Sequence, residues 1–140
     1  KSIIGEIARC HQRLGNVDKA QALLEGAFEL NNPYDLDVLG GFFLETGQYR
    51  RAIPLLKKRS ALEREKNGAE VPLLQQRLAS AYVEVAAYDE AEVIYRASIV
   101  AQQERYGRGN RYTAYFHFRA IYLGLGRGGL QFHVIGHGPV

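Results

Sequence analysis

The chain has 140 residues, of which 46% are hydrophobic and 24% charged, and its formal net charge at pH 7 is +3. These values are ordinary for a soluble globular protein, and the length suffices for one domain with a sizeable core. No apolar run approaches the roughly 18 residues of a membrane span, so we expect no membrane association.

The single cysteine and the first residues bear on where the protein works. Cys10 alone cannot form an internal disulfide, which fits a reducing compartment, and we expect a cytoplasmic location. The first residues lead straight into a helical pattern, so we expect no secretory leader. The lack of an initiating Met suggests a fragment or a processed chain.

Residues 2–33 have the pattern of two helices joined by a tight turn. Gly15 tolerates the left-handed backbone that ends a helix, and Asn16 is placed to cap the next one. Pro33 closes the unit, because proline disfavours helix at the residue before it. The first helix is expected to bury a stripe of residues spaced by three and four: Ile4, Ile7, Ala8, His11 and Leu14. The second helix has an inner face of small and large residues: Ala20, Leu24 and Ala27.

Residues 34–68 repeat this pattern at an offset of 32 positions, so that Gly47 corresponds to Gly15. Pro54 is expected in the first turn of the second helix or just beyond, where its missing N–H costs little. We extend that helix to about Lys66, because Asn67-Gly68 provides a stop.

A third unit, residues 72–107, follows at an offset of 39, which predicts a second helix longer by a turn or two. A fourth, partial unit covers residues 110–126 and begins with Tyr115-x-x-Phe118. Its partner helix is missing, because residues 127–140 contain too much glycine for a good helix and are read as an irregular tail. The uncapped fourth unit predicts self-association or docking of another domain.

The fixed offsets of large and small residues resemble the tetratricopeptide repeat (TPR), as in Leu36-x-x-Leu39-Gly40-x-x-Phe43 followed by Ala52. The third unit is similar to the long repeat of kinesin light chains. In that family a Gly follows the long helix and a Thr opens the next, and Gly107 and Thr113 match, although the usual His-Pro between them is absent. The resemblance implies an all-α, right-handed α-solenoid over residues 1–126, with about three TPR hairpins plus an extra helix.

The resemblance also implies a function. Such solenoids hold another protein in a concave groove lined by the first helix of each hairpin, so we expect a non-catalytic interaction scaffold for a peptide or protein partner, as a module of a larger regulatory protein. The groove candidates are Arg9, Gln12 and Arg13 in unit one, Asp37, Gly41 and Leu44 in unit two, Gln76, Arg77, Ser80 and Val83 in unit three, and Phe116, Ala120 and Leu123 in unit four.

The charge distribution leaves a second hypothesis open. Residues 1–104 carry 13 of the 18 basic side chains and all 15 acidic ones, whereas residues 105–140 carry five arginines among aromatic residues. Such a patch could bind nucleic acid by stacking on bases. We favour packing of the aromatic residues with solvated arginines, because aromatic residues at helical spacing usually belong to the core. Base-reading helical repeats also keep a strict period, which offsets of 32, 39 and 40 do not show. The five arginines are Arg105, Arg108, Arg111, Arg119 and Arg127.

Residues suited to catalysis or metal binding are few, so we expect no enzyme activity, no cofactor and no metal. Cys10 and His11 are adjacent, so on a helix their side chains diverge by about 100° and cannot form a nucleophile–base pair. His11 instead fits a satisfied core histidine. His133 and His137 have a helical metal-ligand spacing but lie in the glycine-rich tail without a neighbouring carboxylate or thiolate. The basic run on the second helix of unit two, from Arg50 to Lys66, is expected to face solvent.

Overall fold

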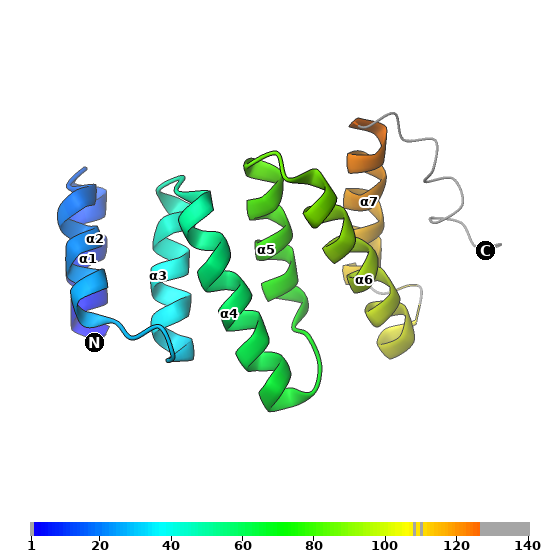
Figure 1. Cartoon of the computed structure of the whole chain (residues 1–140), viewed down its shortest axis with the longest axis horizontal. Helices are drawn as coiled ribbons and strands as arrows, with labels where there is room; N and C mark the ends of the chain where they lie inside the picture. Colours follow the sequence, from blue (N-terminus) through cyan, green and yellow to red (C-terminus); the bar gives the residue numbers. More distant parts are fainter. Residues whose placement is uncertain (1, 108, 110, 127–140) are drawn as a thin grey trace. The chain divides into compact units, whose positions relative to one another are not determined.

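A computed structural model of the chain describes residues 2–107, 109 and 111–126, which form seven α-helices and no strand (Figure 1). The prediction of an all-α fold is therefore confirmed. The chain divides into two compact units, residues 1–71 and 72–140, and each is described by itself. The helices are α1 (Ser2–Arg13), α2 (Val17–Ala27), α3 (Pro33–Glu45), α4 (Tyr49–Asn67), α5 (Pro72–Glu84), α6 (Tyr88–Tyr106) and α7 (Arg111–Gly126).

In the first unit, α1 pairs with α2 and α3 pairs with α4, as antiparallel neighbours joined by short turns (Figure 1). Ala20 and Ala52, which the repeat pattern equates, are completely buried. Gly40 of α3 faces α4, and a Cβ there would lie in ordinary van der Waals contact with Leu56 Cδ2, at 3.6 Å. Small residues on one helix thus make room for leucines on its neighbour.

Tight turns with one hydrogen-bond pattern end α1 and α3. Gly15 has φ +83° and Gly47 φ +74°, and the N–H of the following Asn16 donates to His11 O at 2.8 Å. This pattern is a Schellman motif, which satisfies carbonyls at the helix end. Asn16 is the N-cap of α2, as predicted, but its side chain makes no capping hydrogen bond. By contrast, Asn32 does cap α3, because its Oδ1 accepts from the backbone N–H groups of the next turn.

The second helices differ in length, with 11 residues in α2 and 19 in both α4 and α6. The lengthening predicted for the third unit is present, and α4 is equally long. Pro54 is the sixth residue of α4 and lies just beyond the first turn. The helix continues past it, but the carbonyl of Arg50 lacks the N–H that any other residue at this position would donate.

The buried stripe predicted for α1 is partly wrong. Ala8 is buried, with Ile4 and His11 half-buried beside it, but Ile7 is 45% and Leu14 75% exposed. The reason is that α1 carries apolar residues on two sides. The side with Ile4 and Ala8 faces the core, whereas the side with Ile7 faces solvent.

The core of the second unit joins all three of its helices. Ala79 of α5 packs with Tyr95 and Ile99 of α6 and with a set of α7 residues. Tyr95 is fully buried, and its ring lies 6.0 Å from the ring of Phe116. The α7 members of the core are Phe116, Ala120 and Leu123.

Candidate functional site

One hydrogen bond joins α1 to α3 in the first unit, and Gly5 of α1 faces Val38 of α3. Gln12 Nε2 donates to Glu45 Oε2 at 3.1 Å, and a Cβ on Gly5 would lie 4.0 Å from Val38 Cγ1. Helical spacing places Gly41 on the α3 face between Val38 and Glu45. No atom comes within 4 Å of a Cβ built on Gly41, so the space above this glycine is open.

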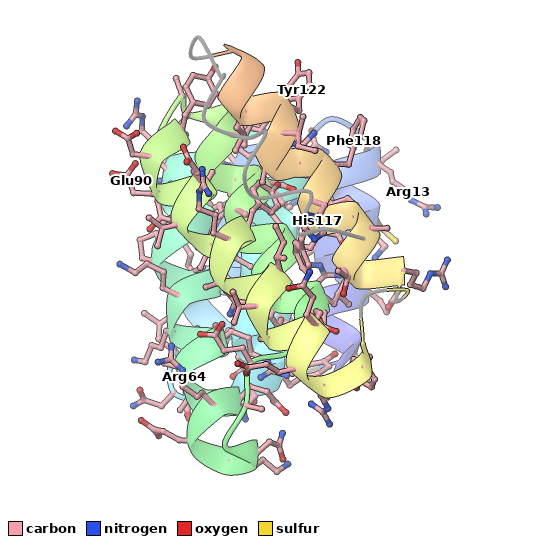
Figure 2. The ribbon with its side chains drawn as sticks, turned by 90° about the vertical axis from the view of Figure 1, so that its right-hand side faces the viewer. Arg13, Arg64, Glu90, His117, Phe118 and Tyr122 are labelled. Carbon is pink, nitrogen blue, oxygen red and sulfur yellow. The ribbon has the colours of Figure 1, made fainter. Side chains whose placement is uncertain are left out.

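The structure brings the six groove candidates of the first unit onto these two helices. Arg9 is exposed and makes an ion pair with Glu6 at 3.2 Å. Arg13 is exposed, and its side chain points away from the helix (Figure 2). The other four candidates are half-buried: Gln12, Asp37, Gly41 and Leu44. The surface mixes charged, polar and apolar groups.

Asp37 is tied to the neighbouring helix rather than free. Arg59 of α4 donates through Nε to Asp37 Oδ1 at 3.0 Å and through Nη1 to Glu63 Oε2 at 2.7 Å. The hydrogen bond between Arg59 and Glu63 raises the pKa of Arg59 and lowers the pKa of the Glu63 carboxyl. The predicted solvated basic run is therefore wrong at Arg59, whose side chain is 16% exposed. The spacing of four residues between Arg59 and Glu63 was the signal for this pair.

The second unit contributes four candidates from α5. Arg77 is exposed, whereas Gln76, Ser80 and Val83 are half-buried. Ser80 makes a hydrogen bond with the phenol of Tyr115 and thereby links the α5 surface to α7. Burial raises the pKa of the Tyr115 phenol above its ordinary value of 10.0.

The candidates predicted on α7 are not on the surface. Phe116, Ala120 and Leu123 are at most 3% exposed and belong to the core, so a partner cannot reach them. Instead Phe118 is 66% and Tyr122 58% exposed, and both side chains point outward from α7 (Figure 2). Because α7 is apolar on all sides, its pattern does not determine which side faces inward.

Two arginines of the C-terminal region lie against aromatic rings, and the guanidinium of Arg105 is 5.2 Å from the ring centroid of Tyr106. Arg119 Nε donates to the Tyr95 hydroxyl at 3.3 Å, and its guanidinium lies 5.7 Å from the ring centroids of Tyr95 and Tyr122. Phe116 is buried, as the packing interpretation expects, whereas Tyr106 is 54% and Phe118 66% exposed, so the interpretation holds only in part. Arg108 and Arg127 lie outside the described residues.

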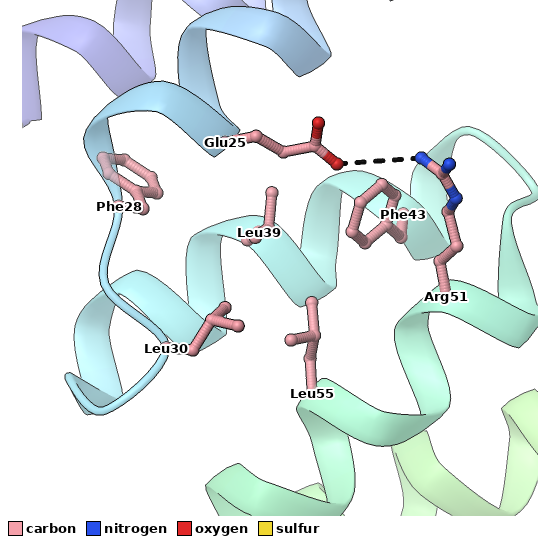
Figure 3. Close-up of a pocket in the computed structure, with 7 residues that line it drawn as sticks. All are labelled: Glu25, Phe28, Leu30, Leu39, Phe43, Arg51 and Leu55. Carbon is pink, nitrogen blue, oxygen red and sulfur yellow. Dashed lines mark ion pairs between the residues drawn. The ribbon is translucent and has the colours of Figure 1, made fainter.

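An apolar cleft that the sequence analysis missed lies between α2, α3 and α4 (Figure 3). Its volume is about 390 Å³. At its rim, Arg51 Nη1 lies 3.7 Å from Glu25 Oε1, and the guanidinium lies 5.7 Å from the ring centroid of Phe43. The lining residues are Glu25, Phe28, Leu30, Leu39, Phe43, Arg51 and Leu55.

Groups suited to other chemistry are sparse in the described part of the chain. His11 Nδ1 is buried without a hydrogen-bond partner among these residues. The prediction that the hydrogen-bonding groups of this histidine are satisfied is therefore wrong. The described residues contain no group of three or more His, Cys, Asp or Glu side chains that could hold a metal ion. His133 and His137 lie outside those ranges. None of the described helices is long and apolar enough to cross a membrane.

Comparison with known proteins agrees with the helical hairpins. Residues 36–70 match the tetratricopeptide repeat family. The fold is similar to the crystal structure of nearly identical TPR-like repeats of a candidate kinesin light chain from Podosopora anserina, with a TM-score of 0.74, 21% identity, and coverage of 91% of this chain and 67% of that chain. A single-residue variant of those repeats matches with a TM-score of 0.72, 20% identity, and coverage of 91% and 66%. No curated protein matches the sequence.

The family match is therefore shown for residues 36–70, and the described helices share the fold of TPR-like repeats. At such identities the likeness to the solved structures concerns the fold, which is that of a TPR-like repeat solenoid. TPR repeats as a class mediate interactions between proteins.

Proposed function

We propose that this protein is a non-catalytic scaffold that binds an extended peptide segment of a partner protein on the first helices of its hairpins. In the first unit the binding surface is the strip between α1 and α3. In the second unit it is the α5 surface around Gln76 and Ser80.

The observation that supports this proposal most directly is the open space above Gly41. A helix interior normally disfavours glycine by roughly 1 kcal/mol relative to alanine, so an open glycine on a helix face calls for a reason other than stability. Helical spacing places Leu44 beside Gly41 on α3, and Gln12 on α1 is joined to α3 by its hydrogen bond to Glu45. An extended peptide needs open space for its backbone and nearby polar groups for its orientation.

The test starts from peptides selected by phage display against the 140-residue chain, with affinity measured by fluorescence anisotropy. Gly41→Arg places a long charged side chain in this space, where a Cβ meets no atom within 4 Å, and we expect it to weaken a peptide bound in the first unit at least about tenfold. Gln76→Ala with Ser80→Arg should do the same for a peptide bound on α5. The matched control is Lys58→Arg, an exposed position on α4.

The outcomes separate the hypotheses. Binding that survives both surface variants, with helicity unchanged, would contradict the proposed surface. A chain that selects no peptide but retains RNA or DNA in a nuclease-sensitive way would favour the nucleic-acid alternative instead.

We further propose that α7 offers a docking contact for another domain or copy through Phe118 and Tyr122. Exposed aromatic side chains four residues apart on a helix form a continuous apolar strip, and burying each stabilises a contact by about 1.5–3 kcal/mol. Phe118→Glu should abolish such docking in sedimentation experiments and leave peptide binding intact.

A further inference from the structure

The cleft between α2, α3 and α4 exists because α2 is the shorter of two helices that lie side by side. A hydrogen bond of 3.4 Å from Gln48 Nε2 to Gln21 Oε1 joins α4 to α2, and Arg51 lies beside Glu25 one turn further along both helices. Because α2 has 11 residues and α4 has 19, α2 ends while α4 continues. The cleft lies where α2 ends, and Phe28, the residue that follows α2, forms part of its wall (Figure 3).

The walls of the cleft suit a single apolar chain. Its volume of about 390 Å³ lies near the lower end of the range for sites that hold small molecules, roughly 300–1,000 Å³. Five of the seven lining residues are apolar, and Leu30 is 48% exposed, whereas the other four are at most 9% exposed and are held in place by core packing. A ligand that covers Leu30 removes apolar surface of both partners from water, which stabilises the complex. The other four apolar residues are Phe28, Leu39, Phe43 and Leu55.

At the rim of the cleft, Arg51 offers a positive charge that is loosely paired. Its Nη1 lies 3.7 Å from Glu25 Oε1, which is longer than a hydrogen bond, and its side chain is 56% exposed. Glu25 already accepts a hydrogen bond of 3.1 Å from Gln21 Nε2. The guanidinium lies 5.7 Å from the ring centroid of Phe43, which places it over the apolar wall. Because a guanidinium has five N–H donors in one plane, Arg51 can donate two parallel hydrogen bonds to another carboxylate.

The helix that carries Arg51 makes the surroundings of the cleft positive. Residues 49–62 of α4 contain five cationic side chains, four of them exposed, and no acidic one. Helical spacing places the exposed Lys58 on the same side of α4 as Arg51 and Leu55. Charges of one sign attract ligands of the other sign, so this helix favours an anionic ligand. The five cationic residues are Arg50, Arg51, Lys57, Lys58 and Arg59.

We propose that the cleft binds a single aliphatic chain that ends in a carboxylate, with the chain against the apolar walls and the carboxylate on Arg51. The lining residues account for both ends of such a ligand. Glu25 competes with the ligand for Arg51, because both are carboxylates beside the same guanidinium. The cleft shares no residue with the peptide surface between α1 and α3, so this binding is a function beyond the capture of a partner peptide.

Isothermal titration of the 140-residue chain with hexanoate, octanoate and decanoate, each below its micellar concentration, tests the apolar part of the proposal. Each added CH₂ group should tighten binding about fourfold, up to the length that fills the cleft. Octan-1-ol and octylamine test the head group. Each should bind at least about tenfold more weakly than octanoate, because neither forms charge-assisted hydrogen bonds with a guanidinium. Affinities that do not depend on chain length, or equal affinities for octanoate and octan-1-ol, overturn the proposal.

Matched variants test the two ends of the ligand separately. Arg51→Gln should bind octanoate and octan-1-ol with similar affinity, whereas Arg50→Gln, at an exposed position that does not line the cleft, should still prefer octanoate. Glu25→Gln should tighten the binding of octanoate, because it removes the competing carboxylate. Leu30→Ser should weaken all the ligands, and its control is Leu73→Ser, because Leu73 on α5 is also 48% exposed. Equal effects within either matched pair overturn the proposal.

Nuclear magnetic resonance locates the ligand without any substitution, so this readout does not depend on the folding of a variant. Octanoate should shift the backbone amide signals around Phe28 and Leu55 and leave those of α6 and α7 unchanged. Saturable shifts confined to α1 or to the second unit would place the ligand elsewhere and overturn the proposal. Binding to vesicles of an anionic phospholipid by a chain that does not bind octanoate would also overturn it, because that result indicates a membrane-binding surface and not a cleft for one chain.

Discussion

Ala86 adopts the same left-handed turn as Gly47, although alanine has a side chain and glycine does not. The φ angle is +60° at Ala86 and +74° at Gly47. Ala86 N–H donates to Val83 O at 3.0 Å, and Gly47 N–H donates to Leu44 O at 3.2 Å. Each residue thus ends the first helix of its hairpin with the same hydrogen bond. The repeat geometry imposes this conformation whether or not the residue favours it.

This relationship predicts that Ala86→Gly stabilises the protein. A left-handed conformation costs a residue with a Cβ roughly 1 kcal/mol relative to glycine, so we expect a gain of about that size in the free energy of unfolding. Urea denaturation measures the change. The reverse change Gly47→Ala should cost a similar amount, because no neighbouring atom would touch its Cβ. An Ala86→Gly variant that is less stable would show that the methyl group contributes packing that outweighs the strain.

Pro54 predicts a second stabilising substitution. It lies inside α4, is exposed, and leaves the Arg50 carbonyl without its helical N–H. Pro54→Ala should therefore raise the free energy of unfolding by up to about 3 kcal/mol. The control is Pro72→Ala at the first residue of α5, where the N–H has no helical partner and the effect should be small. Equal effects at both positions would contradict the assigned cause.

The hairpins and their turns could be predicted because their determinants are local. Gly15 and Gly68 end helices at the expected positions, each with a positive φ, and the small residue Ala20 is buried where the pattern placed it. Helix periodicity and turn chemistry depend on residues a few positions apart, which a sequence displays directly.

What could not be predicted depends on which side of a helix meets a distant partner. Phe116 and Phe118 are both large and apolar on α7, yet the first is buried and the second is 66% exposed. Ile7 looked like a core residue for the same reason. Arg59 pairs with a carboxylate 22 positions away, at Asp37, and such a pairing leaves no periodic signal. The groove candidates therefore lie on the helices to which the pattern assigned them, but those of α7 do not lie on an exposed face.

Asp35 provides a prediction about the link between hairpins. Its side chain is completely buried, and its Oδ2 accepts a hydrogen bond from the backbone N–H of Glu29 at 2.9 Å. Asp35→Ala leaves the Glu29 N–H without this acceptor and should lower the free energy of unfolding by about 1–3 kcal/mol. Asp18→Ala is the control, because Asp18 is exposed in the first turn of α2 and contributes at most about 1 kcal/mol. Thermal melts of both variants make the comparison, and equal losses would contradict a special role for Asp35.

The Arg59–Glu63 pair predicts how stability depends on pH. The hydrogen bond from Arg59 holds the pKa of Glu63 below its ordinary value of 4.5. Between the folded and unfolded pKa values the unfolded chain binds more protons at this carboxyl, so lowering the pH favours unfolding. The stabilisation by Glu63 is therefore fully present above pH 4.5 and is lost as the pH falls through the lower folded value.

Glu63→Gln removes the titrating group, so the stability difference between the unmodified chain and this variant should shrink as the pH falls below 4.5. Urea denaturation at several pH values between neutrality and acid measures that difference. Glu65→Gln is the matched control, because Glu65 is exposed on the same helix and makes no ion pair with any described residue. The difference in the free energy of unfolding between Glu65→Gln and the unmodified chain should stay nearly constant with pH. A Glu63→Gln difference that is equally constant would mean that the carboxylate is not bound to Arg59 in solution.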